Sequence, residues 1–160
     1  MTTINAAIGA TPTTAQASGG SAPVAGPREL LHFGFPNIAA GDNATPASST
    51  PVLVPFCGVT TIPAGMVMMC AGSVTGLAVN LTAAASGSAA IFGVYKNGTI
   101  INAAAIVTIA IAGTKAYLTF ASGAYTFVPG DVLDVRVRTG TGWDVLTTDC
   151  ACAIEIETLT

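Results

Sequence analysis

The chain has a single histidine, His32, so any catalytic arrangement that needs an imidazole base must be built on it. A Ser-His-Asp or Cys-His arrangement requires a nucleophile and an orienting acid beside that base. In sequence, His32 stands between Leu31 and Phe33, and the nearest acid is Glu29. The surrounding composition predicts a mobile segment, so we expect a packed or surface histidine. A small hydrolase that uses His32 is kept as the enzymatic alternative.

Four cysteines could form a thiolate site. Cys150 and Cys152 are two residues apart, which places both thiols on one face of a strand and makes a direct disulfide between them geometrically poor. Together with Cys57 and Cys70 they would supply the four ligands of a zinc site. Their spacing differs from that of zinc knuckles, and the same strand face continues with Ile154. We therefore expect Cys150 and Cys152 to pack in the core.

Four aspartates near the C-terminus raise the possibility of a calcium site, namely Asp131, Asp134, Asp144 and Asp149. They lack the dense, regular spacing of oxygen ligands in a calcium-binding loop. Asp131 is more simply explained as the turn residue after Pro129-Gly130. We expect no metal ion, no cofactor and no small-molecule substrate.

The last two predicted strands carry a polar pattern. Asp134, Arg136 and Arg138 alternate with valines, and Glu155 and Glu157 alternate with isoleucines. Arg136 and Arg138 could therefore pair with Glu155 and Glu157, either across strands or across a subunit interface, where opposed charges select register and partner. The alternative is that the two faces are separately solvated and never meet.

The only tryptophan, Trp143, directly follows a glycine-containing loop at residues 140–142. It could be an exposed anchor for a partner, because tryptophan is enriched among the residues that dominate binding energies. It could also close one end of the β structure as a lid, and we favour the lid.

Charged residues make up only 8% of the chain, against about 25% in ordinary soluble domains. The run from Asn43 to Tyr95 contains no Asp, Glu, Lys or Arg. Such a surface is expected to be covered by lipid, by copies of the chain or by a large assembly. The best candidate for a membrane helix, Ile100–Gly113, is too short and is interrupted by Asn102 and Thr108. We therefore expect no membrane association.

The net charge of −3 and the five scattered basic residues argue against a nucleic-acid partner, because no basic patch is available for phosphates. The first residues have neither a basic region nor a continuous apolar core, so no secretory signal is expected. The chain is accordingly expected to fold in a reducing cytoplasm.

Residues 1–49 are predicted to form an extended N-terminal arm of low complexity, rich in Ala, Thr, Ser, Gly and Pro. One apolar island, at residues 28–38, interrupts it. Its large side chains are expected to dock on a partner by adding a strand or filling a groove. The alternative is that the island is the first strand of the domain. The four docking residues are Leu30, Leu31, Phe33 and Phe35.

Residues 50–160 predict an all-β domain, an antiparallel β-sandwich, because eight or nine short apolar runs are separated by turn residues. Asn97-Gly98 is the strongest hairpin signal. Turns are also expected at 73–75, 113–114, 122–123, 129–131 and 139–142. The expected strands are 52–57, 65–72, 76–83, 88–96, 104–111, 116–121, 125–128, 132–138 and 151–158.

Two segments resemble landmarks of a known fold. The hairpin FGVYKNGTI (Phe92–Ile100) and the turn and strand FVPGDVLDVRV (Phe127–Val137) resemble those of the tumour-necrosis-factor-like jelly roll. That fold recurs in bacteriophage and bacterial surface modules, and the resemblance covers residues 50–160. It implies a jelly roll that forms a homotrimer.

The composition and the N-terminal arm are in addition similar to those of bacteriophage capsid cement, or decoration, proteins. This second resemblance implies a structural virion protein made in the host cytoplasm and bound to the outer capsid surface. The major capsid protein and further copies of the chain would be its partners. A tail fibre or receptor-binding jelly-roll module is the alternative that the same fold implies.

Overall fold

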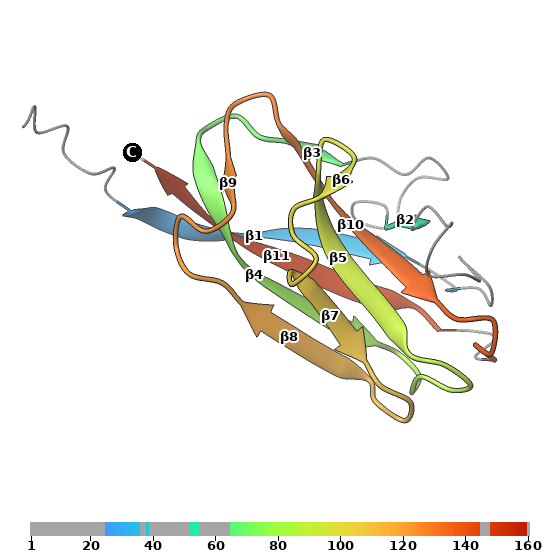
Figure 1. Cartoon of the computed structure of the whole chain (residues 1–160). Helices are drawn as coiled ribbons and strands as arrows, with labels where there is room; N and C mark the ends of the chain where they lie inside the picture. Colours follow the sequence, from blue (N-terminus) through green and yellow to red (C-terminus); the bar gives the residue numbers. More distant parts are fainter. Residues whose placement is uncertain (1–24, 36–37, 39–51, 55–64, 145–147, 160) are drawn as a thin grey trace, which may run out of the picture.

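The computed structural model describes residues 25–35, 38, 52–54, 65–144 and 148–159 of the chain. In these ranges the chain forms two antiparallel sheets that pack face to face, without any helix (Figure 1). The expected all-β antiparallel sandwich is thereby confirmed. The described residues also contain no helix long and apolar enough to cross a membrane.

The first sheet has five strands in the order β1-β11-β4-β8, and β9 pairs with β4. The last strand of the chain, β11, therefore lies inside the sheet, between β1 and β4. The strands are β1 (Ala25–Phe35), β11 (Cys150–Leu159), β4 (Gly72–Leu81), β8 (Lys115–Thr119) and β9 (Thr126–Phe127).

The second sheet has six strands in the order β2-β10-β5-β6, with β3 pairing to β10 and β7 pairing to β5. Its centre is the β10–β5 pair. The strands are β2 (Val52–Val54), β10 (Val132–Thr139), β5 (Ala90–Lys96), β6 (Thr99–Ile100), β3 (Met66–Val67) and β7 (Ile106–Ile109).

The core fills the space between the sheets because apolar residues occupy alternate positions on each strand. In β10, Val135 and Val137 are fully buried, while Arg136 between them lies on the outer face. Cys150 and Cys152 of β11 point into the same core, which confirms their predicted packing role.

Two turns at one end of the sandwich are bonded to each other. Asn97, with a positive φ of 51°, opens the predicted hairpin turn, and its side chain donates to the Asp131 carboxylate at 2.6 Å. The backbone N–H of Val132 donates to Asn97 Oδ1 at 2.8 Å. Asp131 also accepts a bond from the Val128 N–H at 2.9 Å, which confirms its role as a turn residue.

The apolar island does not belong to an arm. Residues 25–35 form strand β1, which pairs antiparallel with β11 from Ala25↔Leu159 to Phe35↔Cys150. Leu31 and Phe33 are buried in the core, so they are not available for docking on a partner. The predicted domain boundary at residue 50 is therefore wrong for this segment. Sequence alone could not decide, because the strand that pairs with it lies more than a hundred residues further along.

The turn predicted at residues 73–75 is also absent. β4 runs continuously from Gly72 to Leu81, and its register against β11 shifts by one residue at Thr75. Thr75 is accommodated as a bulge because its buried hydroxyl donates to Glu155 Oε2 at 2.8 Å. From the sequence alone, Ser-Val-Thr resembles a turn. The sequence does not show that the Thr75 hydroxyl is bonded to Glu155 on a distant strand.

Replacing Phe33 by Ala tests whether β1 is part of the folded domain. Phe33 is 3% exposed, so the truncation is expected to lower the free energy of unfolding by about 3–5 kcal/mol. The matched control is Leu30→Ala on the outer face of the same strand, with an expected change of about 0.5 kcal/mol or less. Urea unfolding at one fixed protein concentration measures both. Equal effects for the two variants would contradict the assignment of β1.

Replacing Asp131 by Ala tests the bonded turns. Hydrogen bonds, first from the Val128 N–H and then from Asn97, lower the pKa of Asp131 below its ordinary value of 3.8. A lowered folded-state pKa means that the ionised carboxylate stabilises the fold above pH 3.8, and that this stabilisation is lost as the pH falls through the folded-state pKa. The variant should therefore be less stable than the wild type at pH 7, with a smaller difference near pH 3. Unfolding is followed at both values, with the exposed Asp144→Ala as control. A deficit that is independent of pH would refute this role.

Candidate association surface

Four side chains on the outer face of the first sheet form one row across its strands. The register pairs His32 with Ala153, Ala153 with Ala78, and Ala78 with Tyr117. Two large side chains thus stand on the edge strands β1 and β8, and two alanines lie between them. Three strand spacings separate His32 from Tyr117, or about 14 Å.

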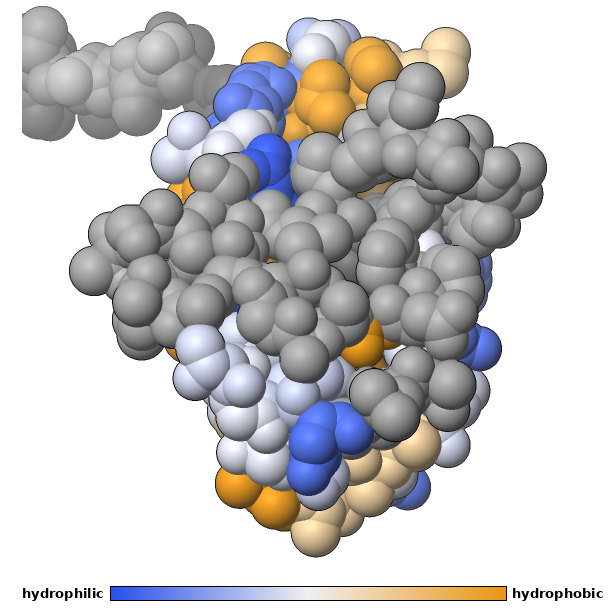
Figure 2. Space-filling model, turned by 90° about the vertical axis from the view of Figure 1, so that its right-hand side faces the viewer, coloured by the Kyte–Doolittle hydropathy of each residue, from blue (hydrophilic) through white to orange (hydrophobic). Residues whose placement is uncertain are grey.

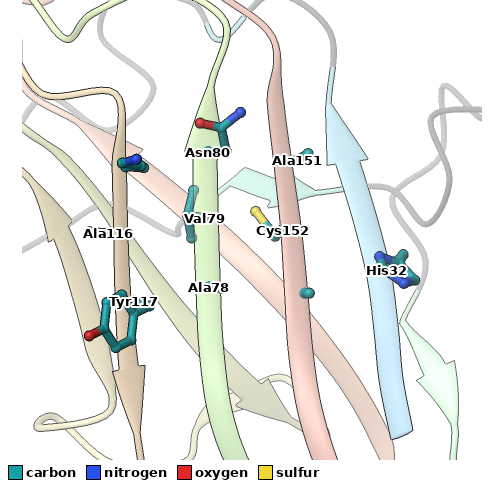
Figure 3. A pocket seen from close by; sticks show the side chains of 10 residues that line it. His32, Ala78, Val79, Asn80, Ala116, Tyr117, Ala151 and Cys152 are labelled. Carbon is teal, nitrogen blue, oxygen red and sulfur yellow. The ribbon is translucent and has the colours of Figure 1, made fainter.

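The neighbouring rows extend this pattern into a trough. Gly34 pairs with Ala151, Ala151 with Asn80, and Asn80 with Lys115. The hollow has a volume of about 820 Å³. Figure 3 shows His32 and Tyr117 on opposite sides of a floor of small residues. Its lining residues are His32, Ala78, Val79, Asn80, Lys115, Ala116, Tyr117, Ala151, Cys152 and Ala153. We call this surface the alanine trough.

His32 and Lys115 stand on the edge strands of the alanine trough and Asn80 on its central strand β4, and these polar groups do not form a catalytic network. Within the described part of the chain, the side chains of His32 and Lys115 have no hydrogen bond or ion pair. Cys152 lies beneath the floor, and the pKa of its thiol is raised well above the ordinary value by its hydrogen bond with Cys150 and by burial. The trough therefore offers contact area and a rigid aromatic side chain, because Tyr117 is 79% exposed.

Other large apolar side chains also reach the surface. Met69 is 93% exposed, and Val67, Ile111 and Val128 are more than half exposed. Figure 2 shows apolar residues in orange at the upper and lower ends of the face that it draws. These exposed apolar side chains add to a described surface that carries few charged residues.

The predicted charge pairs between the last two strands do not form within the chain, because β10 and β11 belong to different sheets. Arg136 instead binds Asp134 of its own strand at 3.0 Å. Glu155 binds Arg28 at 3.3 Å, and Glu157 accepts a bond from the Ser122 hydroxyl at 3.0 Å. Strand alternation predicted the faces correctly and could not show which sheet each strand joins.

Trp143 is buried, with 2% of its surface exposed, and its Nε1 donates to the carbonyl oxygen of Ile38 at 3.2 Å. The reading of this residue as an exposed anchor is wrong, and its packing in the core agrees with the lid. Leu30 is the one predicted docking residue whose side chain is exposed in the structure. The side chain of Phe35 and all of Cys57 lie outside the described residues. Among those described, no group of three or more His, Cys, Asp or Glu is placed to hold a metal ion.

Sequence reasoning missed the residues that make the alanine trough, above all Ala78, Ala151, Ala153 and Tyr117. Their signal was present as small residues at alternate positions in CACA and GLAVN and as an aromatic at the centre of KAYLT. Alternation assigns these residues to a face of a strand. It does not show that the three strands are neighbours, which depends on pairing over long sequence distances.

No protein-family model matches the chain, and no curated protein matches it in sequence.

Proposed function

We propose that this chain is a structural virion protein, a cement protein that binds the outer capsid surface and stabilises neighbouring capsomers. The observation that carries the proposal is the alanine trough, a wide face of small uncharged residues beside an exposed tyrosine. The low content of charged residues supports it, since a protein used as part of an assembly depends less on surface charge for its solubility.

The trough and Tyr117 suit self-association in a homotrimer. Tyr117 stands on edge strand β8, and the floor beside it is made of Ala78 and Ala153. In the proposed trimer, Tyr117 of one copy docks in the trough of the next, which is a heterologous contact that closes into a ring when the rotation is one third of a turn. A tyrosine is a favourable anchor in such a contact because it buries a large rigid surface with few rotatable bonds.

Attachment to the shell is assigned to the segment that precedes β1. Residues 1–24 contain no charged side chain and end where β1 begins. Three such segments in a trimer would combine individually weak contacts into tight binding. A protein that binds only the assembled shell stabilises that shell by mass action. The major capsid protein is the proposed partner, and the capsid surface of the virion is the proposed location.

The trimer is tested by replacing Ala78 with Lys. A long charged side chain on the trough floor should prevent the next copy from docking and convert the trimer to monomer. The matched control is Thr108→Lys, also at an exposed position on the outer face of a strand, but in the second sheet. Native mass spectrometry gives the assembly state of both variants. A wild-type monomer, or an Ala78→Lys variant that remains trimeric, would count against the trough as the contact.

Shell attachment is tested by deleting residues 2–24, which leaves β1 intact. We expect retention on purified shells to fall by about tenfold or more, because three linked contacts are lost together. Sedimentation with the shells measures retention, and the number of copies per particle is counted in parallel. Undiminished retention would refute the role of this segment. A count of a few dozen copies or fewer would point instead to a tail module.

A further inference from the structure

The outer face of the second sheet carries a cluster with different chemistry. Arg136 lies with its guanidinium carbon 4.3 Å from the centre of the Tyr95 ring, a cation–π contact. Its Nε and Nη2 donate to the two oxygens of Asp134 at 3.0 and 3.4 Å. Gly93 is the cross-strand partner of Arg136, and a Cβ there would lie 3.2 Å from Ile100 Cδ1 and 3.4 Å from the Tyr95 ring. The ring contact and the two hydrogen bonds to Asp134 together hold Arg136 in one orientation.

Arg138 lies two residues further on the same strand face, and its side chain has no hydrogen bond or ion pair with any residue that the structure describes. All five basic residues of the protein are described, and Arg28, Lys96 and Arg136 each form an ion pair. Arg138 and Lys115 form none with the described part of the chain. Lys115 is exposed, so water solvates its charge, whereas Arg138 is half-buried. Among the described residues the only buried side-chain nitrogen or oxygen without a partner is Thr148 Oγ1, so the guanidinium of Arg138 remains accessible, and its donors can bind an acceptor that enters from solvent.

Both arginines line one small hollow together with the Tyr95 ring and three isoleucine side chains, those of residues 91, 100 and 106. The Tyr95 hydroxyl has no hydrogen bond within the described part of the chain. Burial raises the pKa of Tyr95 above its ordinary value, so the hydroxyl stays protonated and can donate. The hollow therefore presents two cations and one neutral donor between apolar walls. Asp134 neutralises one of the cations, which leaves a net charge of about +1.

The size of the hollow limits what it can hold. Its volume is about 70 Å³, far below the roughly 300–1,000 Å³ of pockets that enclose whole small molecules. It accommodates one anionic group and the one or two methylene groups behind it. A planar carboxylate matches the fork of donors on a guanidinium, and the isoleucines match the methylenes.

We propose that this hollow, lined by Tyr95, Arg136 and Arg138, binds the carboxylate of a single Asp or Glu side chain presented by another protein. The capsid shell is the source that we name for this side chain, and that part rests on the proposed function. The site lies on the sheet opposite the alanine trough, so a trimer would keep three such hollows open to the shell.

The carboxylate site is tested first without any shell. Sodium acetate is titrated into the protein while the Nε–H signals of Arg136 and Arg138 and the ring signals of Tyr95 are followed by NMR. Sodium chloride at matched ionic strength is the control salt. We expect saturable shifts with acetate that are absent from Arg138→Gln and retained in Arg28→Gln, which removes the same charge from the other sheet. Linear shifts in both salts, or equal responses of the two variants, would overturn the site.

Retention on purified shells then tests the source of the carboxylate. We expect Arg138→Gln to weaken retention about tenfold and Arg138→Lys to restore only part of it, because lysine lacks the fork of donors. Arg28→Gln should retain full binding. Saturable acetate binding combined with full retention by Arg138→Gln would overturn the shell as the source and leave the cement function standing. If the wild-type protein itself is not retained on shells, the proposed function is refuted, and the shell is then also refuted as the source of the carboxylate.

Discussion

The register of β11 between β1 and β4 is the constraint on which the rest of the molecule depends. β11 is hydrogen-bonded to β1 on one side and to β4 on the other. Its register therefore determines which residues of these strands face the core and which face outward. With this register Cys150, Cys152 and Ile154 enter the core, and Ala151 and Ala153 form the trough floor. A shift by one residue would exchange these two sets and place alanines where the core needs volume. Core packing and the outer surface are therefore specified by the same pairing.

The two outer faces of the sandwich follow from the same alternation but differ in chemistry. At the alanine trough, the central strands of the first sheet present Ala78, Ala151 and Ala153, which suits close approach by a flat surface. The second sheet presents Arg136 and Arg138 beside Tyr95, which suits one anionic group. Because the faces are on opposite sides of the core, contact with a further copy and contact with a different protein do not compete. The sandwich fold thereby separates the two proposed interactions.

The distribution of charge agrees with this division. The uncharged run from Asn43 to Tyr95 contains β4, which supplies half of the trough floor. It also contains all of β5 except its last residue, Lys96. Most of the acidic side chains in the second half of the domain are used internally. Asp131 accepts a hydrogen bond within a turn, Asp134 accepts one from Arg136, and Glu155 accepts one from the Thr75 hydroxyl at the bulge. Few charges remain to solvate the surface, which is the physical basis for expecting that neighbours cover it.

The sequence by itself determined what depends on local chemistry. Alternating apolar residues predicted the strands and the inward thiols of Cys150 and Cys152, and the tolerance of Asn97-Gly98 for positive φ predicted the hairpin. Only the tertiary structure decided which strands are neighbours, because pairing is set by contacts between residues far apart in the chain. It therefore placed β1 in the sheet, Trp143 in the core, and Arg136 and Glu155 in different sheets. The alanine trough could not be assembled from the sequence for the same reason, since its residues lie on several strands whose pairing the sequence does not show.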